Sequence, residues 1–207
     1  IKKAEYIWDY YKLWIIGIAA VIILGTSALI YYRHNIRENW FYLMITNTFA
    51  EVGNGSELWK GYVEYSGYDI KVKNVEFNNS SYFDFGDNQI GNSYFEAFVA
   101  YTEAGTLDAV TMEADDLIEL GESGRLLDLD SAACASIKEK YGDRFLYALP
   151  YDVEYSTEPV PVGIDVSDSI LIEKYQVYPE SCALGIGAKS AHPEAVELFL
   201  DYILEGK

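Results

Sequence analysis

The chain has 207 residues, of which 15 are Lys or Arg and 33 are Asp or Glu, so its formal net charge is −18. A protein this acidic is not expected to bind nucleic acid, or to attach to anionic lipid by its overall charge. Half of the residues are hydrophobic, and the part that follows residue 32 is long enough for one domain with its own core.

The first predicted element is a membrane-spanning helix over residues 13–32, LWIIGIAAVIILGTSALIYY, which contains no charged side chain. A helix of this length rises about 30 Å, the thickness of the hydrocarbon core of a bilayer. A buried core helix is disfavoured because a polar stripe is lacking. A cleaved signal peptide is disfavoured because the apolar run is long and ends in an aromatic and basic flank. The residues predicted to anchor the chain in membrane lipid are Leu13, Trp14, Ile15, Ile16, Gly17, Ile22, Ile23, Leu24, Leu29 and Ile30.

The charge distribution predicts the orientation of this helix. The basic residues that flank it are nearly balanced and do not decide the matter by themselves. The residues before position 38, however, contain five Lys and Arg against two acidic residues, whereas the rest contains ten against thirty-one, a net charge of −21. We therefore expect a single-pass protein of the cell membrane. Residues 1–12 form a cytoplasmic juxtamembrane segment, 33–39 a short connector and 40–207 an extracellular domain.

Hydrophobic periodicity and turn residues divide residues 40–207 into alternating strands and helices. The predicted strands or extended segments are 40–48, 70–77, 107–112, 126–129, 145–149, 160–166 and 181–188. The predicted helices are 56–65, 92–102, 113–120, 131–141 and a last one that begins at Ser190 or His192. This alternation predicts an α/β domain with a mostly parallel sheet flanked by helices.

The two cysteines, Cys134 and Cys182, leave two interpretations open. In an oxidising compartment they could form a disulfide. They could equally be two buried thiols, because the sequence does not show whether they are close in space.

Three segments resemble the extracellular solute-binding proteins of ABC transporters. Residues 105–110 (GTLDAV) and 124–129 (GRLLDL) are similar to a strand and a turn of the family's first lobe, separated by a helix. Residues 145–150 (FLYALP) resemble the crossing between lobes, and residues 183–200 resemble a returning strand followed by the family's "N-P-E-A-A-x-x-F-L" helix. The family usually has two lobes that close over a ligand. Only about 60 residues separate the 124–129 turn from the last helix, so the resemblance implies a single lobe.

Binding residues are predicted from the carboxyl ends of the strands, where ligands gather in open α/β sheets. Tyr82 and Phe83, in a loop beside one strand, could stack on a sugar ring or pack on a partner. Ordinary loop and turn roles are the alternative for each residue. The full predicted set is Asn47, Thr48, Asn79, Tyr82, Phe83, Glu113, Tyr151 and Asp152.

The sequence gives little support for catalysis. The two histidines, His34 and His192, have no evident nucleophile or metal partner, and the acidic pairs lack the Gly and terminal Glu of a calcium loop. We therefore expect no enzyme, no cofactor and no metal.

These observations predict a single-pass, membrane-anchored accessory subunit of a membrane transport complex. The resemblance implies the ABC type, with a permease and an ATPase as partners contacted by the extracellular domain. The alternative is a tethered receptor that binds a sugar or a peptide and presents it to a permease. Whether any small molecule binds stays open at this point.

Overall fold

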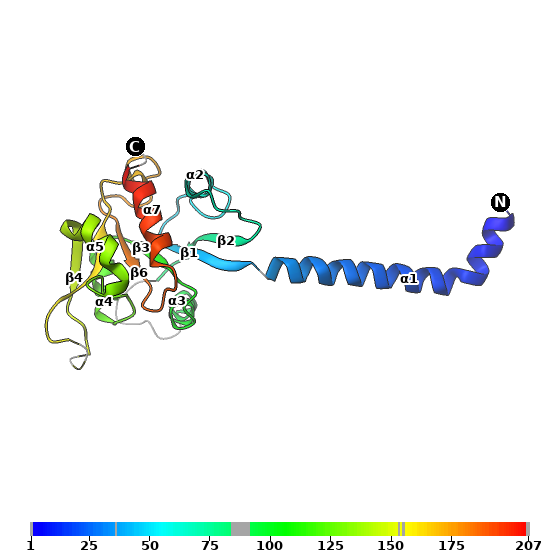
Figure 1. Ribbon diagram of the computed structural model, residues 1–207, viewed down its shortest axis with the longest axis horizontal. Coiled ribbons are helices and arrows are strands. Elements are labelled where there is room, and N and C mark those ends of the chain that lie inside the picture. Colours follow the sequence, from blue (N-terminus) through cyan, green and yellow to red (C-terminus); the bar gives the residue numbers. More distant parts are fainter. Residues whose placement is uncertain (1, 36, 84–91, 153, 155, 206–207) are drawn as a thin grey trace. The chain divides into compact units, whose positions relative to one another are not determined.

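The structure is a computed structural model that describes residues 2–35, 37–83, 92–152, 154 and 156–205 (Figure 1). The chain forms two compact units, residues 1–38 and residues 39–207.

The first unit is the helix α1 (Lys2–Asn35). Its segment Tyr10–Tyr31 has 22 residues, is long and apolar enough to cross a membrane, and has no part buried within the chain. The helix predicted from the sequence therefore exists, and it is longer than the predicted span at both ends. The hydroxyl of Thr26 donates to the carbonyl of Ile22 at 2.8 Å, so the polar group is satisfied within the helix.

The second unit is built on a sheet in the order β2-β1-β3-β6-β5-β4, which has six strands within the described residues (Figure 1). The strands are β1 (Glu38–Thr46), β2 (Lys73–Ser81), β3 (Ala109–Met112), β4 (Phe145–Ala148), β5 (Val160–Asp165) and β6 (Ala183–Ile186). The helices are α2 (Glu57–Ser66), α3 (Ser93–Glu103), α4 (Ala114–Glu122), α5 (Ala135–Tyr141), α6 (Ile170–Glu173) and α7 (Pro193–Glu205), with 3₁₀ turns η1 (Ala132–Cys134) and η2 (Gly142–Arg144).

The sheet is mixed, so the prediction of a mostly parallel sheet is wrong. β1 and β3 are parallel, but β6 is antiparallel to both β3 and β5, and β4 is antiparallel to β5. A parallel neighbour needs a long crossover, usually a helix, to return the chain to the same edge. The described residues of the 149–159 connection contain no helix, and β5 therefore runs back beside β4.

The helices cover both faces of this sheet, because successive side chains of a strand point to opposite sides. Phe41 of β1 packs against Phe199 of α7, with ring centroids 5.5 Å apart, in the larger of two buried clusters. Its neighbour Tyr42 belongs to the second cluster, which includes Phe98 of α3 and Leu117 of α4. The domain is therefore an α/β structure with a sheet flanked by helices, as expected.

Most helix boundaries follow the predicted caps. The Ser56 hydroxyl accepts a hydrogen bond from the amide of Trp59 at the start of α2, and Asn92 caps α3 in the same way. Several details differ from the prediction. The predicted extended segment 126–129 forms only an isolated bridge at Leu126, and the predicted helix 131–141 is the 3₁₀ turn η1 followed by α5. β2 begins and ends later than expected, α4 continues past Gly121, and α6 had not been predicted.

The two cysteines are free and buried. Of the two interpretations left open by the sequence, the structure therefore contains the buried thiols. Burial raises the pKa of both thiols above the ordinary value, which keeps them protonated.

Candidate functional site

A concave surface of the domain lies at the carboxyl end of β1. A hollow of 820 Å³, open to solvent, is lined by residues 47–50 after β1, by Ile172 of α6 and by residues 175–179, which lie between α6 and β6. A second, more polar hollow of 690 Å³ shares Tyr175 with the first and is lined mainly by residues 51–57. We call the two together the Tyr175 hollow.

One wall of the Tyr175 hollow is fastened to the sheet by Tyr178. This side chain is buried, and its hydroxyl lies 2.9 Å from the carbonyl oxygen of Thr46 and 2.7 Å from that of Thr111, at the ends of β1 and β3. Burial raises the pKa of Tyr178 well above its ordinary value, so the hydroxyl remains a donor. The hydroxyl of Thr48 adds a second link, to the carbonyl of Val177 at 2.7 Å.

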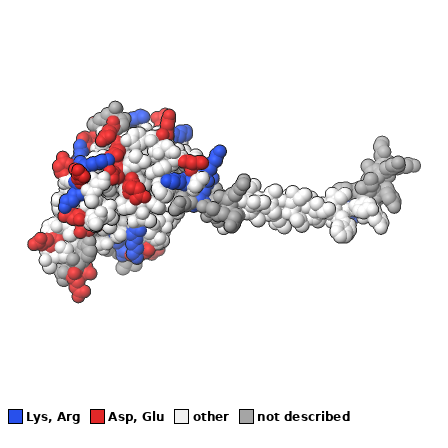
Figure 2. Space-filling model, in the orientation of Figure 1, with Lys and Arg blue, Asp and Glu red and all other residues white. Residues whose placement is uncertain are grey.

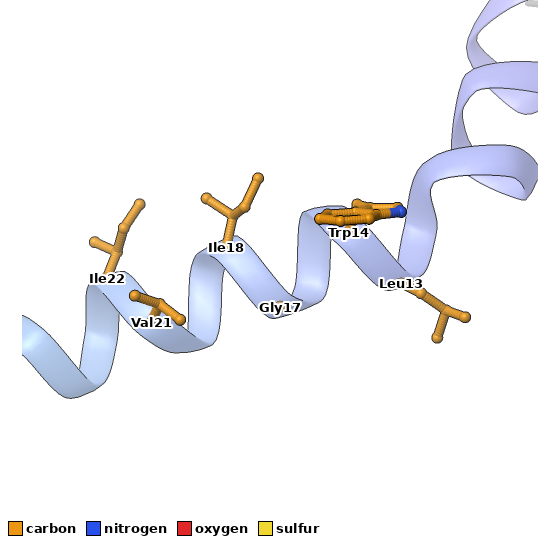
Figure 3. A pocket seen from close by; sticks show the side chains of 6 residues that line it. All are labelled: Leu13, Trp14, Gly17, Ile18, Val21 and Ile22. Carbon is orange, nitrogen blue, oxygen red and sulfur yellow. The ribbon is translucent and has the colours of Figure 1, made fainter.

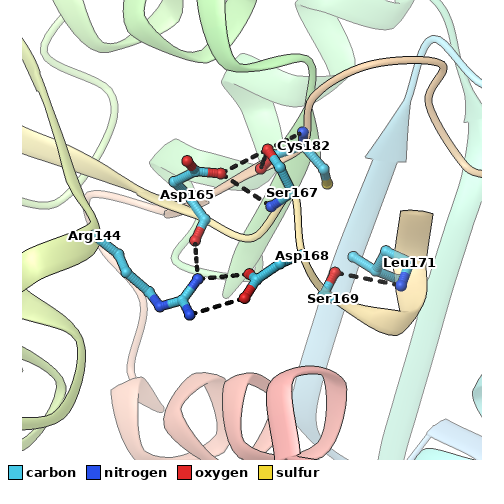
Figure 4. Close-up of polar contacts among 7 residues, drawn as sticks. All are labelled: Arg144, Asp165, Ser167, Asp168, Ser169, Leu171 and Cys182. Carbon is cyan, nitrogen blue, oxygen red and sulfur yellow. Dashed lines mark hydrogen bonds and ion pairs between the residues drawn. The ribbon is translucent and has the colours of Figure 1, made fainter. Parts of the chain in front are cut away.

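A polar network holds the turn that leads into this wall (Figure 4). The Arg144 guanidinium makes a bidentate pair with the Asp168 carboxylate, at 2.6 and 3.0 Å. The Asp165 carboxylate accepts hydrogen bonds from the amide and the hydroxyl of Ser167, and that hydroxyl accepts one from the amide of Cys182. The end of β5 and the start of β6 are thereby joined, which sets the path of residues 166–181.

The opposite wall is held by asparagine side chains. Asn47 has a positive φ of 54°, a conformation that Asn tolerates better than most residues. Its amide group pairs with both the amide and the carbonyl of Phe83, at 3.0 and 2.8 Å. Asn79 donates to the carbonyl of Ala50 at 2.8 Å. Across the hollow, Gln176 also has a positive φ, of 50°. Two residues in this rare conformation thus face the same space, a pattern found at functional sites.

Phe49 is the exposed group at the rim of the hollow. Its side chain is 93% exposed, although the segment that carries it is fixed by Thr48 and Asn79. Its ring lies against that of Tyr82, with centroids 5.3 Å apart, and Tyr82 in turn contacts Tyr94. The arrangement presents an apolar aromatic face beside a polar hollow.

The structure brings together only part of the predicted site. Asn47 and Thr48 line the first hollow, Asn79 lines the second, and Tyr82 lies at the rim beside Phe49. Their polar groups hold the loops in place, so the ordinary loop role that was the alternative interpretation describes what they do in this structure. Glu113 is at the end of β3 on the same edge, close enough to influence the pKa of Tyr178, but it does not line the hollow.

Three predicted residues are placed elsewhere. Phe83 is buried under α3, where its ring packs on those of Phe95 and Phe98. Tyr151 and Asp152 are exposed and follow β4. Because β4 is antiparallel to β5 and runs opposite to β3, its carboxyl end lies at the other edge of the sheet. Tyr151 and Asp152 were predicted as binding residues because they follow a strand. The prediction fails because the direction of that strand in the sheet was predicted wrongly.

The sequence interpretation missed the residues contributed by the 172–179 segment, above all Tyr175, Gln176 and Tyr178. It also missed Phe49, which directly follows the predicted strand residues 40–48. Tyr and Gln residues in a short connection form no recognisable sequence motif. The position of this segment opposite the end of β1 becomes evident only from the antiparallel pairing of β6 in the sheet.

Metal binding depends on how close together the acidic, His and Cys side chains of the described residues lie. The described residues contain no group of three or more His, Cys, Asp or Glu side chains that could hold a metal ion. His192 directly precedes α7; its ring stacks on that of Trp40, with centroids 4.5 Å apart, and its Nδ1 lies 3.3 Å from the Glu194 carboxylate. These are structural contacts, and they agree with the expected role of His192 at a helix start.

A separate apolar groove of 450 Å³ runs along α1 (Figure 3). It is lined by Leu13, Trp14, Gly17, Ile18, Val21 and Ile22. Gly17 has no other group within 4 Å of where a Cβ would stand, so the helix surface is open at this point. An acyl chain or another helix could fill such a groove equally well.

Comparison with known proteins gave no match to a family model, to a curated protein or to a solved structure. The function of the chain is therefore argued from its own residues.

Proposed function

We propose that this protein is a single-pass, membrane-anchored accessory subunit of a membrane transport complex, acting through protein–protein contacts of its extracellular domain. The observation that carries this proposal is Phe49, a fully displayed aromatic ring on a segment fixed at the rim of an open hollow. Buried aromatic anchors dominate the binding energy of protein interfaces, and a pre-ordered loop lowers the entropy cost of binding.

The state of the polar groups favours a protein partner over a small solute. A small-molecule site encloses most of its ligand and offers a few convergent polar groups. The Tyr175 hollow is open, and the side chains of Asn47, Thr48 and Asn79 are already bonded to the backbone. An aromatic rim around a wide polar depression resembles instead one side of a protein interface.

The membrane and transport parts of the proposal have separate supports. Tyr10–Tyr31 is long and apolar enough to anchor the chain, and the acidic second unit suits the extracellular side, with the basic N-terminal residues in the cytoplasm. The ABC type, with a permease and an ATPase as partners, rests on the resemblance of residues 105–110, 124–129, 145–150 and 183–200 to solute-binding proteins.

A tethered receptor for a sugar or a peptide is the second candidate. The two parts of the Tyr175 hollow have volumes in the range of ligand sites, and the paired rings of Phe49 and Tyr82 could stack on a sugar. Under this alternative, the permease covers the open side of the hollow and so encloses the solute that is presented to it.

The test is purification of the full chain from membranes of its native host in mild detergent, with identification of every co-purifying polypeptide. We expect a permease and an ATPase in stoichiometric amounts with the wild type. Phe49→Ala should weaken their retention by about 30-fold or more, the loss typical of an interface hot spot.

The matched control is Tyr147→Ala, which removes an exposed ring (52%) from β4 and should retain both partners. A chain that purifies alone, or that keeps its partners after Phe49→Ala, would contradict the proposal. A thermal shift of the lone chain with a sugar or peptide would then support the receptor.

A further inference from the structure

The turn before β2 exposes two apolar side chains. Ile70 is 36% exposed and Val72 is 60% exposed, with the exposed Lys71 between them. The Asp69 carboxylate accepts a hydrogen bond from the amide of Lys71 at 3.0 Å, and the Asp69 carbonyl accepts from the amides of Val72 and Lys73. The turn is thus well ordered, and its own backbone bonding holds it in a shape that displays Ile70 and Val72.

Aromatic rings support this turn from behind. The ammonium nitrogen of Lys73 lies 3.2 Å from the centroid of a Trp40 ring and 4.8 Å from that of Tyr68. The Trp40 and Tyr68 rings meet edge to face at 6.1 Å. We call the group formed by Trp40, Tyr68, Ile70, Lys71, Val72 and Lys73 the Val72 surface. Apolar, aromatic and lysine side chains together are the composition that membrane–water interfaces favour.

The Val72 surface carries two lysines whose ammonium groups are not paired with a carboxylate of the described chain. Five other basic residues of the described second unit are paired with carboxylates, namely Arg125, Lys138, Lys140, Arg144 and Lys189. Lys71 and Lys73 form no ion pair with a carboxylate among the described residues of the domain, and neither do Lys60 and Lys174. Figure 2 shows basic side chains gathered near the start of β1. The positive charges of Lys71 and Lys73 are therefore available to an anionic partner.

The place of this surface in the chain indicates what that partner is. Trp40 is the fifth residue after Asn35, the last residue of α1, and five residues of extended chain span at most about 18 Å. The Asn74 side chain donates to that of Asn39 at 3.0 Å, which ties the start of β2 to the start of β1. The Val72 surface thus adjoins the point where the chain enters the domain.

We propose that the Val72 surface docks on the outer face of the bilayer crossed by α1. Ile70 and Val72 lie at the boundary of the acyl chains, and Lys71 and Lys73 contact headgroup phosphates. The acidic remainder of the domain is repelled by anionic lipid, so attraction and repulsion favour the same orientation. α1 already holds the domain at the membrane; the surface has only to orient it. This inference rests on the membrane anchor of the proposed function and is independent of the transport partners.

The test uses the full chain in nanodiscs of phosphatidylcholine, with and without phosphatidylglycerol. A fluorophore is attached at Val72→Cys, and its quenching by lipid with a spin-labelled headgroup is measured. The matched position is Ser80→Cys, an exposed site near the other end of β2. Wild type labelled in parallel gives the background, because both native cysteines are buried.

We expect strong quenching at position 72, little at position 80, and an increase at position 72 with phosphatidylglycerol. Lys71→Gln should lower the ratio of docked to undocked domain by about fivefold at low salt, whereas Lys60→Gln, which makes the same change of net charge on α2, should not. Equal quenching at both positions in both lipids would overturn the proposal. A chain that fails to enter nanodiscs would instead refute the anchor, so the two failures are distinguishable.

Discussion

Tyr178→Phe tests whether the wall of the Tyr175 hollow depends on one hydroxyl. The substitution keeps the ring and removes the group that lies 2.9 Å from the Thr46 carbonyl and 2.7 Å from the Thr111 carbonyl. Both carbonyl oxygens are buried, so removal of the hydroxyl leaves a buried acceptor without this donor. We expect the free energy of unfolding to fall by about 2 kcal/mol. For a domain of this size that loss lowers the melting temperature by about 4–8 °C. The measurement is thermal and urea unfolding of the full chain in detergent, followed by near-ultraviolet circular dichroism.

The pH dependence of the same variant gives an independent check. Burial raises the pKa of Tyr178 in the folded state well above its ordinary value of 10.0, whereas in the unfolded state the hydroxyl ionises near that value. The stability that this group contributes is complete below pH 10 and is lost as the pH rises from there toward the folded-state pKa. The phenylalanine variant has no such loss. The difference in stability between the two proteins should therefore shrink by about 1 kcal/mol between pH 10 and pH 11.

The control for this experiment is Tyr147→Phe, which alters an exposed ring on β4 and should change stability by less than about 0.5 kcal/mol. The reasoning is refuted if Tyr178→Phe costs no more than this control at neutral pH. It is also refuted if the difference from the wild type grows above pH 10, because the hydroxyl would then ionise more readily in the folded state.

Three further predictions concern neighbouring parts of the domain. Asn47→Ala should cost about 2 kcal/mol in urea unfolding, because it removes both bonds to the Phe83 backbone and leaves an alanine at φ 54°; a loss below 0.5 kcal/mol would count against this. Gly121→Ala should cost about 1–3 kcal/mol, because its Cβ would lie 2.5 Å from a side chain of β5; a neutral effect would show that α4 shifts freely. Cys134 and Cys182 should react with iodoacetamide only after unfolding, as measured by intact mass; rapid alkylation of the folded chain would contradict their burial.

Local sequence signals predicted the individual elements well. Ser56 and Asn92 are helix caps in the structure, and most of the aromatic, β-branched run of residues 40–48 lies in strand β1, which ends at Thr46. These signals work because capping and side-chain alternation act between residues close in the chain. Strand direction is decided by pairing between distant segments, and nothing in residues 145–149 or 160–166 shows whether they lie parallel. The mixed sheet could therefore not be predicted from the same signals.

The candidate site shows the same division. Asn47 and Thr48 were found because they directly follow β1, and Asn79 because it lies in the last residues of β2, at the same edge of the sheet. Tyr151 was misplaced because β4 ends at the opposite edge. The far wall, with Tyr178, comes from a connection that crosses back over the ends of β1 and β3. The path of this connection is set by contacts between residues about 130 positions apart in the chain, so no local sequence pattern predicts it.

The two proposed surfaces lie at opposite ends of β1, and this separation restricts the partner. β1 has nine residues, which span about 30 Å. If the Val72 surface rests on the headgroups, Phe49 stands about that far from them, beyond the reach of short permease loops. The partner that contacts Phe49 must then have an extracellular part of its own. Photocrosslinking from position 49 distinguishes the cases. Capture of such a part agrees with both proposals, whereas capture of lipid or of a short membrane-level loop would show that the domain does not dock through Val72.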